Sequence, residues 1–148
     1  MVGIIEVAER AGVSTATVSR ALNGKSHVSA RAREKVLKAA QELGYVASSS
    51  AYTLATGRSK NIGVVMPYID RWFFSAVLDG AVNALVNRGY DVTLYSLSGG
   101  PASRKRVFED LVLRKRVDGV LTVAVKLSEG ELKRLSELQK PIVGIGGP

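Results

Sequence analysis

Apolar side chains in the first 46 residues recur at intervals of three and four, the spacing of helices with one buried face. Three helices are predicted, over residues 4–11, 15–22 and 30–43. Most of their buried positions are small, which allows the helices to cross closely. The predicted core residues are Val7, Ala8, Ala11, Val18, Ala21, Leu22, Ala32, Val36, Ala39, Ala40 and Leu43.

Turn and capping residues join the first two helices. Gly12 follows the first helix and tolerates a left-handed backbone, and Ser14 stands where its hydroxyl can accept from the N–H groups of the next turn. Gly44 ends the third helix in the same way as Gly12. A glycine turn followed by a helix with a polar outer face is typical of a helix-turn-helix unit, which places that helix in a DNA major groove. A helical hairpin inside an ordinary core is the alternative interpretation.

Residues 47–60 are small and polar, with Leu54 as the one large aliphatic side chain. A flexible linker is one interpretation. The serines and Gly57 equally suit the two ends of a helix of about nine residues, a length that is marginal alone in water. Such a helix would form when another molecule orders it.

From residue 61 the pattern changes to strands alternating with helices. Strands are predicted over residues 62–66, 91–95, 119–125 and 141–145, and helices over 73–87, 103–116 and 128–138. Each strand is apolar throughout, which indicates a parallel sheet covered on both faces. The fold class is therefore a small all-α headpiece with a hinge helix, followed by a partial α/β parallel-sheet subdomain. Any ligand crevice is expected at the carboxyl ends of the strands.

Charge and composition favour a polyanionic partner. The 148 residues carry a net charge of +8; residues 1–60 hold nine Lys and Arg against four Asp and Glu, and residues 61–148 hold twelve against nine. Solubility alone is the alternative explanation. The chain contains no cysteine and one histidine, so neither a disulfide framework nor a metal site is expected, and no cofactor is predicted. No run is apolar enough to span a membrane and no export signal is visible, which predicts a cytoplasmic protein.

With both halves laid out, the chain resembles the LacI/GalR family of bacterial transcription regulators. The resemblance is carried by Val7-Ala8, Ala11-Gly12-Val13-Ser14, Thr17-Val18-Ser19-Arg20-Ala21-Leu22-Asn23, Val28-Ser29, Arg33, Val36, Leu43-Gly44-Tyr45, Leu54-Ala55, Ile62-Gly63-Val64-Val65 and Val117-Asp118-Gly119-Val120. It covers essentially the whole chain, whereas the chain covers less than half of a typical member. Only the N-terminal subdomain of the family's two-subdomain core is expected here.

The resemblance implies a headpiece at residues 1–46, a hinge helix at 47–60 and an incomplete effector-binding core at 61–148. It implies a dimer on a palindromic operator and, in the full-length form, a small sugar-like effector between two subdomains. The implied DNA-binding residues are Ser14, Thr15, Ala16, Thr17, Ser19, Arg20, Asn23, His27 and Leu54. Leu54 matches the residue that hinge helices wedge into the minor groove, where an aliphatic side chain unstacks and kinks the duplex.

The residues after the first strand suggest one wall of an effector site. Trp72 and Phe73 offer aromatic faces for a sugar, and Asp70 offers a hydroxyl acceptor. Burial in the core is the alternative for the three aromatic residues, and Phe74, on the apolar stripe of the following helix, is expected in the core. A ligand held by one wall remains half hydrated, so these 148 residues alone are expected not to respond to an effector.

The sequence departs from the family at several positions. Gly3 stands where the family usually has Thr, Ala47-Ser48 where it often has Pro-Asn, and Tyr52 or Thr53 where it often has Arg.

Other classes of protein are alternatives to this family. A dinucleotide-binding enzyme needs glycines after its first strand, where this chain has Pro67-Tyr68-Ile69-Asp70, and no nucleophile–base pair is visible. A small-molecule binding protein would lack the headpiece. A truncated regulator that binds DNA without sensing remains an alternative.

Overall fold

The computed structural model describes residues 1–146, apart from the side chains at positions 51, 55, 112 and 113. The chain divides into two compact units, residues 1–57 and residues 58–148, and each is described by itself. Among the described residues, no helix is both long enough and apolar enough to cross a membrane.

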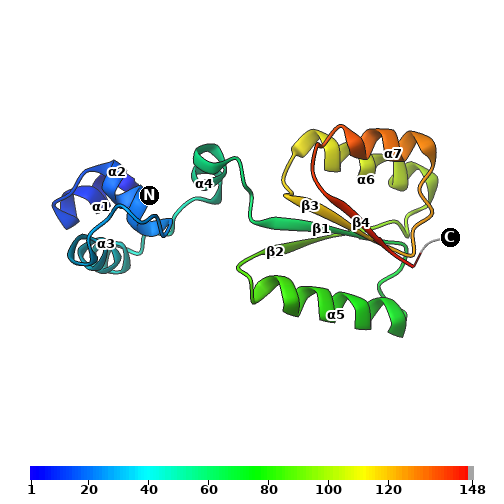
Figure 1. Ribbon diagram of the computed structural model, residues 1–148, viewed down its shortest axis with the longest axis horizontal. Helices are drawn as coiled ribbons and strands as arrows, with labels where there is room; N and C mark the ends of the chain where they lie inside the picture. Colours follow the sequence, from blue (N-terminus) through cyan, green and yellow to red (C-terminus); the bar gives the residue numbers. More distant parts are fainter. Residues whose placement is uncertain (147–148) are drawn as a thin grey trace. The chain divides into compact units, whose positions relative to one another are not determined.

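The first unit is entirely helical and consists of α1 (Ile4–Ala11), α2 (Thr15–Leu22), α3 (Ala30–Leu43) and α4 (Ser49–Thr56). The helices α1, α2 and α3 all contact one another (Figure 1). Valine and alanine fill the space between them, as the sequence predicts. The buried residues are Val7, Ala8, Ala11, Val18, Ala21, Val36, Ala39 and Ala40.

The predicted caps of these helices are present. Gly12 and Gly44 adopt left-handed φ angles of 65° and 63° at the ends of α1 and α3. Ser14 Oγ accepts a hydrogen bond from the backbone N–H of Thr17 at 3.2 Å, which fixes the start of α2. The backbone N–H of Gly3 donates to Glu6 Oε2 at 3.0 Å, so α1 keeps half of a capping box although its N-cap residue, Gly3, has no side chain.

The second unit is a four-stranded parallel sheet with helices on both faces (Figure 1). Its strands are β1 (Asn61–Met66), β2 (Asp91–Ser96), β3 (Gly119–Val123) and β4 (Ile142–Ile145), in the order β2-β1-β3-β4. Helix α5 (Trp72–Val86) covers one face, and α6 (Gly100–Arg114) and α7 (Glu129–Ser136) cover the other. This order reverses direction between β1 and β3, the switch point at which open α/β sheets hold ligands.

Burial on both faces explains the apolar runs of the central strands β1 and β3. The expectation of full burial was wrong for the edge strands β2 and β4, which contain no buried residue. In β1, Val64 and Met66 pack with Phe74 of α5, whereas Val65 packs with Phe108 and Leu111 of α6. Successive side chains of a strand point to opposite faces, so both sets of positions must be apolar.

Several predicted boundaries in the second unit were wrong. Helix α6 begins at Gly100 rather than Ser103, because Pro101 fits a first helical turn, and it ends at Arg114 because Lys115 turns to a left-handed φ of 46°. The strand predicted over 119–125 ends at Val123, where Ala124 adopts a left-handed φ of 49°.

Asp118 fixes the path by which the chain enters the sheet. Its carboxylate accepts from the backbone N–H groups of Ser59 at 2.8 Å and Lys60 at 2.9 Å, and from the Ser59 hydroxyl at 3.1 Å. Charge-assisted bonds of this kind are stronger than neutral ones. The carboxylate therefore joins the segment before β1 to the start of β3.

An ion pair links α6 to α7. Arg104 Nε lies 2.5 Å from Glu131 Oε1, and its terminal nitrogen donates to Glu131 Oε2 at 2.8 Å and to the Lys126 carbonyl at 2.7 Å. Glu131 also accepts from the backbone N–H of Ser128, its partner in a complete capping box of α7. The hydrogen bond from Arg104 lowers the pKa of Glu131, so the carboxylate stays ionised below its usual range.

We expect Glu131→Gln to lower the free energy of unfolding of the second unit by about 1–3 kcal/mol at neutral pH, because Arg104 loses its ionised partner. The folded pKa is lowered, so the stabilisation is present above the usual carboxylate pKa and disappears as the pH falls through the folded value. Urea unfolding followed through NMR signals of β1 and β3, from neutral to acid pH, tests this.

Glu137→Gln is the matched control, because the Arg134–Glu137 pair is about half exposed. Equal losses in the two variants at neutral pH, or a Glu131→Gln loss that persists at acid pH, would contradict the assignment.

Candidate nucleic-acid interface

Helix α2 divides into a buried and an exposed side. Val18 and Ala21 are buried in the helical core. The exposed side carries most of the sequence-predicted DNA contacts. Ser14, Thr15, Ala16 and Arg20 are exposed, and Thr17 and Ser19 are partly exposed. The helix thus presents hydroxyls and one guanidinium without giving up any packing residue.

Several polar groups on this side are already held by neighbours. Ser14 Oγ lies 2.9 Å from Thr17 Oγ1, and Asn23 Nδ2 donates to Ser19 Oγ at 3.4 Å. These bonds connect predicted contact residues at each end of α2. They limit the rotamers of these side chains, and side chains ordered in advance lose less entropy when they bind a partner.

Arg33 of α3 fixes the C-terminal end of α2, a role that the sequence analysis missed. One terminal nitrogen donates to the Ala21 carbonyl at 2.8 Å and the other to the Lys25 carbonyl at 2.9 Å. A cation at a helix C-terminus satisfies carbonyls that lack helical partners and interacts favourably with the helix dipole. The available signal was spacing: Arg33 lies three residues before Val36 and so borders the buried stripe.

The segment after α2 continues the polar surface. Lys25 and His27 are exposed, and together with Arg20 they offer donors to phosphate oxygens. The Arg10–Glu42 ion pair, with a separation of 2.9 Å, joins α1 to α3, but both side chains are well exposed and add little stability.

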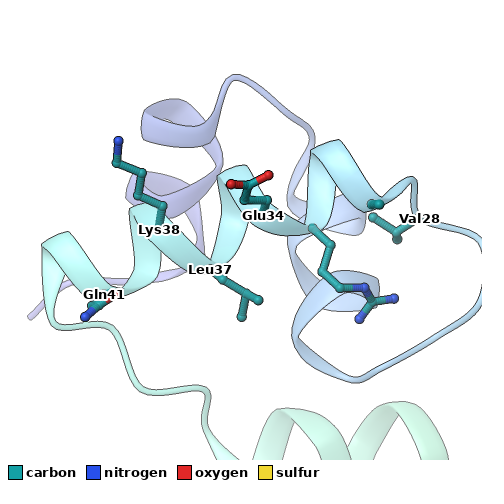
Figure 2. A pocket seen from close by; sticks show the side chains of 7 residues that line it. Val28, Glu34, Leu37, Lys38 and Gln41 are labelled. Carbon is teal, nitrogen blue, oxygen red and sulfur yellow. The ribbon is translucent and has the colours of Figure 1, made fainter.

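The headpiece also has an open depression of about 530 Å³ on the outer side of α3, and Figure 2 shows Glu34, Leu37, Lys38 and Gln41 along it. None of the sequence-predicted DNA contacts lines this depression. The candidate interface is therefore the protruding side of α2 and not a pocket, as a major groove requires.

Helix α4 contains Leu54, whose side chain is 89% exposed. Ser48 makes no side-chain cap, and Gly57 ends the helix with a left-handed φ of 67°. The Thr53 hydroxyl donates to the Ser49 carbonyl at 2.9 Å, a bond within the same helix. An eight-residue helix that exposes its largest aliphatic side chain gains little from packing.

In the second unit, the predicted effector residues lie at the junction between β1 and α5. Trp72 is 82% exposed and Phe73 38% exposed, whereas Phe74 is buried, which confirms the core interpretation for Phe74 alone. The rings of Trp72 and Phe73 are edge-to-face with centroids 6.1 Å apart. Asp70 is exposed beside them.

Comparisons with known proteins agree with this arrangement. A family model described as bacterial regulatory proteins, lacI family, matches residues 3–48. The repressor PurR of Vibrio campbellii is 36% identical over 142 residues, covering 96% of this chain and 42% of that protein. The regulator pepR1 of Lactobacillus delbrueckii subsp. lactis is 31% identical over 145 residues, covering 98% of this chain and 43% of that protein. A lac repressor dimer bound to operator and the anti-inducer ONPF superimposes with a TM-score of 0.80 at 30% identity, over 99% of this chain and 45% of that one.

The chain belongs to the LacI/GalR family. It corresponds to the N-terminal portion of a member and spans less than half the length of the curated relatives it matches. The fold class predicted from the sequence, a helical headpiece followed by a partial parallel α/β sheet, is confirmed. The relatives are named as transcriptional regulators and not as enzymes.

We expect Arg33→Ala to lower the free energy of unfolding of this LacI-type headpiece by about 1–3 kcal/mol, because two carbonyls lose a charged donor. Amide exchange at Gly24 and Lys25 should accelerate more than exchange in α1. Urea unfolding followed through NMR signals of α1–α3 measures both effects.

Arg31→Ala, an exposed arginine on the same helix, is the control and should change stability by less than about 0.5 kcal/mol. If Arg31→Ala were as damaging as Arg33→Ala, the loss would reflect general charge and not the contact with α2.

Proposed function

We propose that this chain is the DNA-binding portion of a LacI-type transcriptional repressor, together with part of its effector-binding core. The observation that carries the proposal is α2: its polar side is exposed while its buried side and the Arg33 contacts hold it in place. The net charge of +8 supports a polyanionic partner. The names of PurR and of the operator-bound lac repressor support the same assignment.

In this proposal α2 enters the major groove. Thr15 and Ala16, at the start of the helix, reach base edges, where the alanine methyl group can meet only a thymine methyl. Arg20 pairs with guanine or holds a phosphate. Ser14, Thr17, Ser19, Asn23 and His27 contribute phosphate and base contacts from around the helix.

Two copies of the chain bind a palindromic operator, since two-fold symmetry in the protein requires it in the DNA. Each α4 then presents Leu54 to the minor groove, where insertion of an aliphatic side chain kinks the duplex. The bend lets two headpieces reach flanking major grooves. The 89% exposure of Leu54 supports this role, because the side chain is not occupied in packing.

The junction between β1 and α5 would form one wall of a cleft for a small sugar-like effector. Trp72 and Phe73 stack on apolar sugar faces, and Asp70 accepts hydroxyl hydrogen bonds. Their exposure at the carboxyl end of β1 supports the assignment. A regulator that binds DNA without sensing an effector is the alternative for these 148 residues.

We expect Arg20→Ala to weaken binding to the best palindromic duplex by about 1–3 kcal/mol, the cost of one strong base or phosphate contact. The duplex is first selected from a random library, and affinity is then measured by gel shift at fixed salt. Lys38→Ala is the control, because it also removes one cation but lies on the outer side of α3 (Figure 2).

If Arg20→Ala bound the selected duplex as tightly as the unchanged protein and as tightly as Lys38→Ala, the assignment of α2 as the recognition helix would be wrong.

We expect residues 49–56 to be ordered further by operator DNA, because α4 lacks a side-chain cap and exposes Leu54. Amide exchange in α4 should slow at least tenfold with the selected duplex and much less with a scrambled duplex of the same length and composition. Leu54→Ala should reduce this difference. The same protection of α4 with and without the selected duplex would rule out coupled folding.

A further inference from the structure

A cleft of about 210 Å³ lies on the flank of the second unit, between the edge strand β2 and helix α6. It is lined by Thr93, Tyr95, Ser103, Arg106, Val107, Asp110, Arg114 and Arg116. The lining thus contains three arginines and a single carboxylate, that of Asp110. Because it runs along the side of the sheet, it is separate from the Asp70–Phe73 junction at the end of β1.

Two residues that line this cleft, Thr93 and Arg116, are held by the same amide side chain. Asn61 Nδ2 donates to Thr93 Oγ1 at 2.8 Å and to the Arg116 carbonyl at 3.0 Å. Asn61 of β1 therefore connects the side chain of Thr93 in β2 to the backbone of Arg116. A loop arginine with its backbone tied in this way is better positioned than one on a free loop.

The Tyr95 ring packs closely against the backbone of Gly63 in the neighbouring strand β1. A Cβ on Gly63 would lie 3.1 Å from Tyr95 Cε2 and 3.2 Å from Val117 Cγ1, so a side chain there would push the ring or Val117 aside by a few tenths of an ångström. Burial raises the pKa of the Tyr95 hydroxyl, and Arg116 and Arg114 oppose that rise. Both guanidinium groups are therefore near the phenol, which remains protonated and able to donate.

The positive charge of the cleft is only partly compensated. Arg114 approaches Asp110 at 3.7 Å, an exposed and loose pair. In the part of the chain that the structure describes, Arg106 makes no ion pair and Arg116 makes none. Three cations against one anion leave the cleft with a net charge of +2 beside the hydroxyls of Thr93, Tyr95 and Ser103.

We propose that this cleft binds a small phosphate-bearing molecule, with the arginines around the phosphate and the Tyr95 hydroxyl as a further donor. Guanidinium groups approaching from α6 and from the loop before β3 suit the oxygens of a tetrahedral anion, which a planar carboxylate does not match from several directions. A cleft of about 210 Å³ can hold a small molecule but is too small for a DNA duplex. This site is additional to the DNA interface and to the sugar-like effector proposed above, and does not depend on either.

The test is a titration of the ¹⁵N-labelled 148-residue chain with inorganic phosphate, with ionic strength held constant by sodium chloride. We expect saturable shifts at the amides of Thr93, Tyr95 and Arg106, with a Kd below about 1 mM. Reading individual amides separates this site from phosphate on the basic headpiece. Acetate at the same ionic strength should bind at least tenfold more weakly.

Arg106→Gln and Lys105→Gln form a matched pair, since they remove one charge from adjacent positions of α6 and Lys105 does not line the cleft. We expect Arg106→Gln to weaken phosphate binding about tenfold or more and Lys105→Gln to leave it within about twofold. Asp110→Asn should tighten binding, because it removes the one carboxylate, and a misfolded variant cannot produce that gain. Tyr95→Phe keeps the ring over Gly63 and should weaken binding by a smaller factor.

Shifts that grow linearly with phosphate and match those with chloride would overturn the proposal, as would equal losses in Arg106→Gln and Lys105→Gln. Weaker binding in Asp110→Asn would overturn it as well, because it would mean that the carboxylate and not the positive charge organises the site.

Discussion

Helices of eight residues are too short to persist alone in water, so α1 and α2 depend on burial against α3. That burial is made with the smallest apolar side chains, which lets the three axes approach closely and closes a core with few residues. The caps at Gly12 and Ser14 then fix the angle at which α2 leaves the turn. The part of the candidate DNA interface that lies on α2 follows from this packing, since the packing decides which side of α2 faces solvent.

The second unit is governed by a different constraint, the topology around β1. The chain passes from β1 to β2 in one direction and from β2 over β1 to β3 in the other, and right-handed crossovers then place α5 and α6 on opposite faces. Because the chain reverses direction between β1 and β3, the loops after these two strands diverge from each other. The Asp70–Phe73 junction follows β1 and lies at this point of divergence. The sheet thus positions a candidate ligand wall without contributing any of its own side chains to it.

Much of this architecture was predictable because it depends on local periodicity and on capping chemistry. The three headpiece helices, the four strands and the burial of Phe74 follow from patterns that repeat over a few residues. The start of α6 did not, since Pro101 reads equally well as a loop or as a first helical turn. The contacts of Arg33 with α2 were not predictable from the pattern, because Ala21 and Lys25 lie 12 and 8 residues away in the chain. The arginines around Tyr95 were not predictable either, because they come from α6 and the segment after it while Tyr95 lies on a strand. Contacts of that kind depend on tertiary structure and leave little trace in spacing.

Different residues of α2 pack in the core and face solvent, and this separation affects how such proteins diversify. Val18 and Ala21 carry the packing, and the carbonyls held by Arg33 secure the far end of the helix, while Thr15 and Ala16 touch neither. Exposed helix positions can be exchanged at little cost in folding free energy. Under the proposed function, new target sequences can therefore arise by single substitutions at the start of α2 without a loss of folding. Duplicated copies of such a gene could then acquire different regulatory targets before anything else in the protein changes.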